Sequence, residues 1–424
     1  MKRGIWALAV WCMVLGPVSA NTDGVLALRQ KIAKMVAGSP VLFGASVGIY
    51  LKALDDGHVP YTRNPSMAMM PASNFKVLTV GVALDRLGAD YRYETKLLAP
   101  PNAVQAGVLH GNLVLKGTGD PSWLDPWERP AEGVLEDFAD ALDKQGVHEI
   151  DGDLVGDDSA FDREFLGRGW KQRYLNCDYA AQCAALSLNG NLVNVNVEPS
   201  GIRTYPKSPA IHIMRQKSSR GGSLAFSRRY GTNDIHISGT GFGGSAFTVN
   251  NPSLFTLQAF HSVLARHKIK VVGAVRLVDP DHEQTPADFQ TLALHKSKPL
   301  IVMLRYLCKE SDNFFAQHVF KELGYVVKGK GTLENSSNTI YDFMRRENID
   351  PAGMMIADGC GLSVLDRISA RQMVDYLGAL YNLPIRKLFM STLARAGKDG
   401  TMSYRLAGLP VWAKTGTING TCTL

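Results

Sequence analysis

The feature that most constrains this chain is a serine followed three residues later by a lysine, at the start of an apolar run. Ser73-Asn74-Phe75-Lys76 is the only S-x-x-K in the 424 residues, and residues 77–84 are apolar almost throughout. Such a run predicts a helix that is buried on most of its faces. Positions three apart lie on one face of a helix, so Ser73 Oγ and Lys76 Nζ can meet.

A hydroxyl beside a buried amine is suited to nucleophilic catalysis. Burial disfavours the charged ammonium and lowers the pKa of a lysine, which lets Lys76 take the proton of Ser73. A bare S-x-x-K also arises by chance in chains of this length. The pair therefore predicts catalysis only if further motifs accompany it.

Two further motifs follow in order along the chain. Ser311-Asp312-Asn313 is an S-x-N, a weak signal alone because S-x-N occurs at two other places. Lys414-Thr415-Gly416 is a K-T-G, which occurs once. S-x-x-K, S-x-N and K-T-G in this order form the set found in penicillin-binding proteins and serine β-lactamases.

Composition and charge narrow the class of protein. With 45% hydrophobic residues the chain can bury a large core and has room for two or three domains. A net charge of +7 suits an anionic polymer or surface as partner. The basic residues do not cluster with aromatic ones, which argues against nucleic acid. Because no C-x-x-C or H-E-x-x-H spacing occurs, we expect no metal or cofactor.

The first twenty residues have the pattern of a secretory signal peptide. Lys2 and Arg3 precede an apolar run over 5–15, and small residues lead to a cleavage site after Ala20. We therefore expect signal peptide 1–20, export to the periplasm and no transmembrane anchor. Export permits disulfides; for Cys177 and Cys183 a bridge and two separate thiols remain equally open.

The pattern of hydrophobic and turn residues along the chain changes twice. Helices are expected over 24–37, from Ser73 to Gly88, and over 299–307, 314–323 and 333–346; strands are expected over 42–51 and 411–418. Between them, 92–285 consists of short strand-like runs separated by turn residues. We therefore expect a catalytic domain split into 21–91 and 286–424, with one or two β-rich domains inserted at 92–285. All three motifs lie outside this insert, so we expect it to be dispensable for reaction with small β-lactams.

Two glycine motifs are set aside. Residues 44–48 match the G-x-S-x-G nucleophile elbow, but that elbow needs a strand, a turn and then a helix, whereas strand pattern continues through these residues. Residues 239–244 match G-x-G-x-x-G, but no helix follows and no acidic residue lies about 20 positions on. Neither motif predicts a site.

The ordered motifs, the insert and the signal pattern resemble the class C low-molecular-mass penicillin-binding proteins. These are D-alanyl-D-alanine carboxypeptidases and endopeptidases of the cell wall. The resemblance extends over nearly the whole mature chain and includes further short matches at 117–121, 157–161, 185–189, 358–363 and 400–401. It implies an α+β fold, an α/β sandwich with a β-lactamase/transpeptidase-like catalytic domain that carries β-rich insertions.

The resemblance also implies a mechanism on peptidoglycan stem peptides. Ser73 attacks the penultimate D-alanine to form an acyl-enzyme, with Lys76 as its base. Ser311 relays the proton to the leaving amine, and Asn313 holds the substrate amide. β-Lactams acylate the same serine and act as covalent inhibitors.

The K-T-G strand is expected to bind the terminal carboxylate. Lys414 and Thr415 supply a cation and a hydroxyl donor. Gly416 lets the substrate backbone approach, because no Cβ intervenes. The backbone N–H groups of Ser73 and Thr417 are expected to form the oxyanion hole.

The chain departs from the family pattern at two places. Cys360 stands where serine is usual, and the chain stops at Leu424, eight residues after Gly416. We expect a C-terminally truncated sheet with an unpaired edge, which favours poor solubility or loss of activity. A catalytically dead peptidoglycan-binding protein is therefore the alternative from another class, and a β-lactamase is the alternative enzyme.

Overall fold

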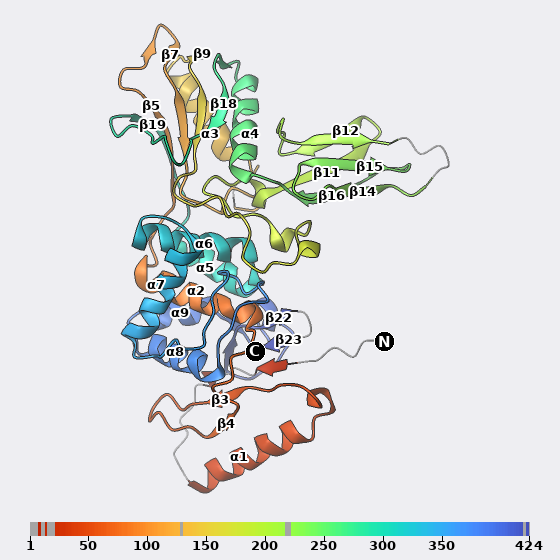
Figure 1. Ribbon diagram of the computed structural model, residues 1–424, viewed down its shortest axis with the longest axis vertical. Helices are drawn as coiled ribbons and strands as arrows, with labels where there is room; N and C mark the ends of the chain where they lie inside the picture. Colours follow the sequence, from red (N-terminus) through yellow and green to blue (C-terminus); the bar gives the residue numbers. More distant parts are fainter. Residues whose placement is uncertain are drawn as a thin grey trace.

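The computed structural model describes residues 7–9, 13–14, 22–127, 130–216, 222–418 and 421–423. Along the long axis of Figure 1 a helical body lies in the middle. A body of sheets and two helices lies at one end, and an N-terminal helix with a hairpin lies at the other. Two small sheets extend to one side. The architecture is α+β.

The middle body is built around α2, the helix expected after Ser73. A 3₁₀ turn over Ala72–Phe75 leads into α2, Lys76–Arg86, and Gly88 follows with φ +86°. Residues 76–84 are all buried, as the apolar run predicts. The helices of this body that surround α2 are α5 (Leu300–Tyr306), α6 (Asn313–Lys328), α7 (Leu333–Arg346), α8 (Ala370–Asn382) and α9 (Arg386–Thr392).

Helix α8 packs directly on the backbone of α2. The Tyr376 hydroxyl donates to the Leu78 carbonyl at 3.0 Å. A Cβ added to Gly81 would lie 2.2 Å from the Tyr376 hydroxyl oxygen. The catalytic helix therefore needs glycine at position 81, since any side chain there would push α8 away.

The strand expected over 411–418 is divided. Strand β21, Val411–Ala413, pairs with β20, Ala394–Arg395, and β22, Gly416–Ile418, pairs with β23, Thr421–Thr423. Lys414 and Thr415 lie in the break between the two strands.

Strand β1 (Ala7–Ala9) pairs with β23 at the edge that was expected to be unpaired. Likewise β2 (Met13–Val14) pairs with β21. Because β1 lies inside the predicted signal peptide, the unpaired edge of the mature chain stays a prediction. The other residues of 1–20 lie outside the described residues, so the signal peptide stays a prediction.

The N-terminal helix α1 (Thr22–Ala37) is as expected, but the strand after it is shorter. Strand β3 covers only Ile49–Leu51 and pairs with β4 (Tyr61–Arg63). A 3₁₀ turn occupies Pro40–Leu42, and Gly44 has φ +73°. Proline and a left-handed glycine break the extended backbone that the apolar pattern predicted.

The sheet-rich body contains more helix than the sequence suggested. Its largest sheet has the order β18-β10-β8-β5-β19, and α3 (Gly133–Lys144) and α4 (Pro252–Arg266) pack on it. Its strands are β5 (Glu94–Ala99), β8 (Leu113–Lys116), β10 (Leu154–Asp157), β18 (Val275–Leu277) and β19 (Gln290–Lys296). Since β19 pairs with β5, this sheet reaches past residue 285.

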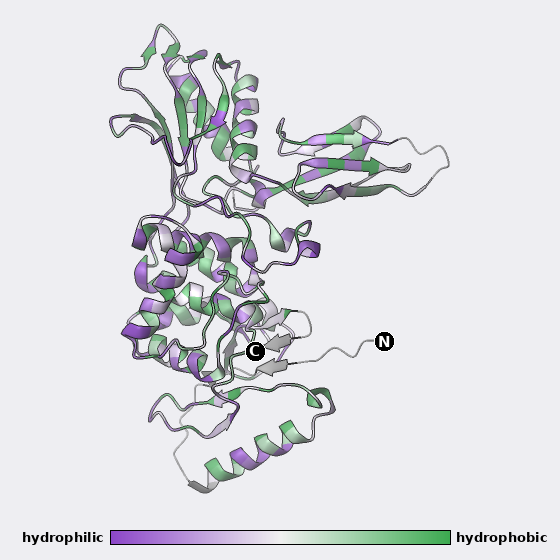
Figure 2. Cartoon of the chain, viewed as in Figure 1, coloured by the Kyte–Doolittle hydropathy of each residue, from purple (hydrophilic) through white to green (hydrophobic). Residues whose placement is uncertain are grey.

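Three smaller sheets complete the region. A four-stranded sheet consists of β6 (Val104–Gln105), β7 (Val108–His110), β9 (Glu149–Asp151) and β17 (Lys270–Val271). The two lateral sheets consist of β11 (Leu192–Glu198), β12 (Gly201–Tyr205) and β16 (Gly243–Thr248), and of β13 (His212–Arg215), β14 (Ala225–Arg228) and β15 (Asp234–Ser238). Hydrophobic and hydrophilic residues alternate along β11 (Figure 2), as expected for a strand with one buried face.

Two large apolar cores hold the molecule together, one in the helical body and one in the sheet-rich body. The core of the helical body also contains Tyr174, Leu175, Ala180 and Ala181, which belong to the region 92–285. Part of the insert thus packs with the catalytic helices. No helix among the described residues is both long and apolar enough to cross a bilayer.

Candidate active site

Ser73 and Lys76 lie together at the start of α2. Lys76 Nζ is 3.0 Å from Ser73 Oγ. Ala72, directly before the serine, has φ +49°, a conformation that costs energy for a residue with a Cβ and is common at functional sites. The S-x-x-K pair therefore has the contact that its spacing predicts.

Lys76 has two further partners, and both are carbonyl oxygens. Its Nζ lies 2.6 Å from Asn313 Oδ1 and 2.8 Å from the Cys360 carbonyl. The lysine is fully buried, and burial lowers its pKa below the ordinary value, although nearby groups such as Cys360 and Asp358 oppose this shift. A lowered pKa makes the neutral amine more accessible near neutral pH.

The S-x-N residues come from the junction of α5 and α6. A π-helical turn ends at Ser311, which has φ +60°, and Asp312 caps α6 by accepting from Phe315 N at 2.8 Å. Asn313 Nδ2 donates to the Tyr179 carbonyl at 2.8 Å. This bond turns the amide so that its oxygen faces Lys76.

Lys414 lies in the break between β21 and β22 and faces Ser311. Its Nζ donates to Ser311 Oγ at 2.8 Å and to the Thr415 carbonyl at 2.7 Å. Burial, with the nearby charge of Lys76, lowers the pKa of Lys414 to about 7. Thr415 Oγ1 is 2.9 Å from Thr401 Oγ1, so Thr401 contacts the K-T-G segment.

These side chains border one cleft of about 380 Å³. The residues that line it are Ser73, Tyr174, Tyr179, Ser311, Asn313, Gly361, Leu362, Thr417 and Ile418. Lys76 and Lys414 are buried beside it and reach it through their contacts with Ser73 and Ser311. The structure thus brings residues of all three motifs to one place, although 238 positions separate the two serines in the sequence.

Comparison with known proteins agrees with this geometry. The model of the D-Ala-D-Ala carboxypeptidase 3 (S13) family matches residues 28–424. The chain belongs to this family. It is a serine-type carboxypeptidase, and the α+β, transpeptidase-like fold expected from the motifs is confirmed.

Relatives and a solved structure support the assignment of this S13 peptidase. A D-alanyl-D-alanine carboxypeptidase of Actinomadura sp. (strain R39) is 28% identical, over 96% of this chain and 80% of the relative. The carboxypeptidase DacB of Haemophilus influenzae is 28% identical, over 90% of this chain and 82% of the relative. The crystal structure of penicillin-binding protein 4 from H. influenzae superposes with a TM-score of 0.76 at 27% identity, covering 88% of this chain and 85% of that one.

The sequence did not anticipate that the insert forms part of the peptidase cleft. Tyr174 and Tyr179 line it, and the Tyr179 carbonyl fixes Asn313. We call residues 162–187 the docked segment, because they lie against α6 and the cleft. Removal of 92–285 would take Tyr174 and Tyr179 away from the cleft. That this region is dispensable for reaction with small β-lactams stays a prediction. No local motif marks these tyrosines.

The docked segment is attached by buried polar contacts. Lys321 on α6, 3% exposed, pairs with Asp162 at 2.6 Å. His318 Nε2 lies 2.9 Å from Ser187 Oγ, and burial lowers the pKa of His318 to about 4. The imidazole is therefore neutral at physiological pH.

Cys360 and Cys183 are buried thiols with raised pKa values. Cys360 is fully buried, and burial raises the pKa of its thiol well above the ordinary value. Cys177 and Cys183 are both free thiols, so of the two alternatives left open the bridge is wrong. Burial raises the pKa of Cys183 to about 12.

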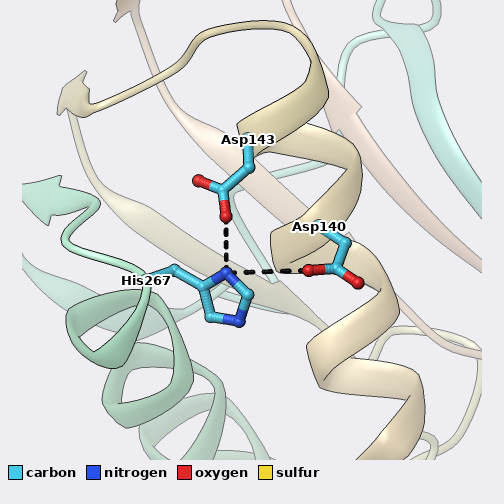
Figure 3. Close-up of side chains that lie close together, drawn as sticks. All are labelled: Asp140, Asp143 and His267. Atoms are coloured by element: carbon cyan, nitrogen blue, oxygen red, sulfur yellow. Dashed lines mark hydrogen bonds and ion pairs between the residues drawn. The ribbon is translucent and has the colours of Figure 1, made fainter.

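Among the residues that the structure describes, one group combines metal-ligand side chains: Asp140, Asp143 and His267 (Figure 3). His267 Nδ1 lies 2.6 Å from Asp143 Oδ2, and its Nε2 lies 2.8 Å from Glu136 Oε2. These two hydrogen bonds raise the pKa of His267. A protonated imidazole that donates both N–H groups accounts for this geometry. The group is an ion-pair cluster that joins α3 to the end of α4.

Proposed function

We propose that this peptidase releases the terminal D-alanine of peptidoglycan stem peptides through an acyl-enzyme on Ser73. Neutral Lys76 takes the proton of Ser73, whose Oγ attacks the carbonyl carbon of the penultimate D-alanine. The peptide bond then breaks, Ser311 gives its hydroxyl proton to the leaving amine, and the proton that Lys76 took from Ser73 passes to Ser311, so that Lys76 is neutral again. Water hydrolyses the resulting ester and restores the free serine.

The contacts of Lys76 support its assignment as the base. As a neutral amine it has two N–H groups and one lone pair. The oxygens of Asn313 and Cys360 can only accept, so they take the two N–H groups. Of these partners Ser73 alone has a proton to give. This arrangement is the observation that carries the proposal.

Lys414 and Thr415 are proposed to hold the terminal carboxylate of the substrate. Lys414 is protonated below its pKa of about 7. A substrate carboxylate beside it favours the charged form and raises that pKa, so binding and charging of Lys414 reinforce each other. Strand β22 lies at the edge of its three-stranded sheet, with Gly416 buried and Thr417 exposed, and the substrate backbone can lie along this edge.

The proposed oxyanion hole uses the backbone N–H groups of Ser73 and Thr417. Both residues border the cleft. A preorganised N–H donor of this kind contributes roughly 10²–10³ in rate in other hydrolases. Asn313 is proposed to orient the substrate amide.

Export and β-lactam binding belong to the same proposal. The pattern of residues 1–20 and the net charge of +7 fit an exported protein that acts on the anionic cell wall. A crystal structure of penicillin-binding protein 4 from H. influenzae contains a bound β-lactam. We propose that β-lactams acylate Ser73, and that endopeptidase action on cross-links uses the same acyl-enzyme.

The test is to locate the adduct of a labelled penicillin by mass spectrometry. We expect one adduct, on the peptide that contains Ser73, and release of D-alanine from a pentapeptide that ends in D-Ala-D-Ala. Ser73→Ala should abolish both. Ser46→Ala removes the serine of the rejected G-x-S-x-G motif and should change neither.

Two results would overturn the proposal. A label on Ser46, or on any serine other than Ser73, would displace the nucleophile. Rapid release of hydrolysed penicillin without D-alanine release would identify a β-lactamase instead.

A further inference from the structure

The loop at residues 358–363 lies against the nucleophile. The Cys360 carbonyl accepts from Lys76 Nζ at 2.8 Å. The next residue, Gly361, has φ +78°, and a Cβ there would lie 1.8 Å from the carbonyl oxygen of Ala72, the neighbour of Ser73. A small displacement of this loop would therefore move a partner of the catalytic lysine.

The Asp358 carboxylate holds the loop in place. Its Oδ1 accepts from the backbone N–H of Cys360 at 2.9 Å and of Gly361 at 2.6 Å. Its Oδ2 accepts from the N–H of Ser363 at 2.7 Å and from the indole N–H of Trp170 at 2.7 Å. Asp358 is fully buried, so these four donors compensate a charge that would otherwise be costly.

Asp358 and Lys76 bind the two ends of one peptide unit. In a trans peptide the C=O and the following N–H point in opposite directions from one rigid plane. The unit that joins Cys360 to Gly361 has its C=O on Lys76 and its N–H on Asp358. The direction of the carbonyl that receives the lysine is thus fixed by the aspartate.

Trp170 connects this arrangement to the docked segment. Beside it, the Arg168 carbonyl accepts from Ser363 Oγ at 2.6 Å, and Arg168 N donates to the Ala357 carbonyl at 3.2 Å. The segment therefore contacts both ends of the loop. Trp170 supplies the contact that reaches the carboxylate itself.

We propose that Asp358 is a positioning residue for Lys76 and that Trp170 of the docked segment holds it in place. Through the peptide after Cys360, the carboxylate aims the lysine amine at Ser73. The inference rests on the proposed role of Lys76 as base. It makes the inserted region part of the acylation apparatus and gives the 358–363 motif a function.

The charge of Asp358 should also affect the pKa of Lys76, which a purely structural role of Asp358 would not do. The ionisable groups that face Lys76 are Asp358, Asp312, Lys414 and the thiols of Cys308 and Cys360. Asp358 in turn faces the buried Asp366, whose pKa is raised by burial and by the charge of Asp358. Burial lowers the pKa of Lys76, and the negative charge of Asp358 opposes this. Asp358→Asn removes the charge, so the pKa of Lys76 should fall further.

The experiment measures the second-order rate constant of acylation by a labelled penicillin as a function of pH. For Asp358→Asn we expect a maximal rate about 100-fold lower, with the acid limb shifted to lower pH, because that limb reports the free base. Asparagine keeps one acceptor oxygen, but its NH₂ cannot accept from Trp170 and Ser363. A uniform loss without a shift of the limb would mean that Asp358 is merely structural and would overturn the inference.

Trp170→Phe tests the connection while keeping an aromatic ring. Loss of the N–H to a carboxylate should lower the acylation rate about tenfold without moving the acid limb, since the charge remains. Trp123→Phe is the matched control: Trp123 is also in the insert and buried, and its N–H is among the buried groups without a partner in the described part of the chain. We expect less than about a threefold change there. Equal losses in the two variants would contradict the role of Trp170.

The double variant of Trp170→Phe and Asp358→Asn tests whether the two residues act on the acylation rate through one another. If Trp170 acts through Asp358, Trp170→Phe should cost less than about twofold in the Asp358→Asn background. Additive losses would show independent roles and overturn the inference. Thermal unfolding shows whether Asp358→Asn is folded. If it is not, the comparison of Trp170→Phe with Trp123→Phe tests the inference.

Failure of the inference is distinguishable from failure of the proposed function. If the wild-type chain is not acylated at Ser73, the proposed function fails. If it is acylated and Asp358→Asn leaves the rate and the pH profile unchanged, only the inference fails.

Discussion

The region 92–285 meets its surroundings in two different ways. Its docked segment packs on α6 through the pairs Asp162–Lys321 and Ser187–His318 and borders the cleft. The body formed by α3, α4 and the five-stranded sheet has an apolar core of its own, and its helices are joined by the cluster at His267. A single insertion in the sequence thus contains a cleft wall and a separate body.

Two histidines show the physical difference between these parts. His318 in the docked interface is fully buried, and burial lowers its pKa to about 4, so it is neutral at physiological pH. His267 near the surface is hydrogen-bonded to Asp143 and Glu136, and these bonds raise its pKa and favour its charged form. Changes in the docked segment should therefore affect both stability and catalysis, while changes at His267 should affect only local stability.

The largest effect on the acylation rate is expected for substitutions in the cleft itself. Lys76→Arg should lower the acylation rate about 10⁴-fold or more, because arginine stays protonated and cannot act as a base. Lys414→Arg should be milder, since a cation facing the carboxylate is all that is needed there. Stopped-flow acylation by a penicillin measures both. Equal losses would contradict the division of roles between the two lysines.

The docked interface should give the next largest effect. Lys321→Met leaves Asp162 without its buried partner and should destabilise the protein by about 3 kcal/mol. Lys328→Met on the same helix is the control, because its pair with Asp342 is exposed and should be worth under about 1 kcal/mol. Urea unfolding followed by fluorescence measures both. Indistinguishable midpoints would show that the docked segment is not held by this pair.

Acid should loosen the same interface through His318. Its pKa is about 4 in the folded protein, against about 6.5 when unfolded. Neutral His318 therefore contributes fully to the free energy of unfolding above about pH 6.5. This contribution, about 3 kcal/mol, is lost as the pH falls toward 4. His318→Gln should flatten this part of the curve of unfolding free energy against pH. An unchanged slope would remove His318 as the cause.

The smallest effect is expected in the α3–α4 body, with the opposite sign. The pKa of His267 is higher in the folded protein than in the unfolded chain. Its ion pairs therefore contribute fully to the free energy of unfolding below the pKa of the unfolded chain, and this contribution is lost as the pH rises through the pKa of the folded protein. His267→Gln should cost under about 1 kcal/mol, since its partners are half exposed. It should leave acylation unchanged. A loss of acylation would show that this body is coupled to the cleft after all.

Much of the catalytic body could be predicted from the sequence. The apolar run over 77–84 gave a helix buried on all faces, and 333–346 is a helix with the expected bounds. Two helices of the insert were missed. The signal was present for α3, where Val134, Leu135, Phe138 and Leu142 recur at helical spacing and are buried.

Other features leave no local signal. Tyr174 and Tyr179 enter the cleft because the docked segment folds back on α6, not because of residues next to them. Strand β19 joins β5 across nearly two hundred positions, so the limits of the insert at 92 and 285 stay a prediction. A long-range pairing depends on both partners, and a local pattern describes only one of them.

The sequence alone determined the chemistry of this protein. The S-x-x-K spacing sets Ser73 and Lys76 one helical turn apart, and an apolar run buries the amine; both are local consequences of helix geometry. Only the tertiary structure decided what surrounds that pair. The carbonyl of Cys360, the amide of Asn313 and the indole of Trp170 reach the site from three distant segments. Their directions are fixed by packing and by rigid peptide planes, which no short pattern encodes.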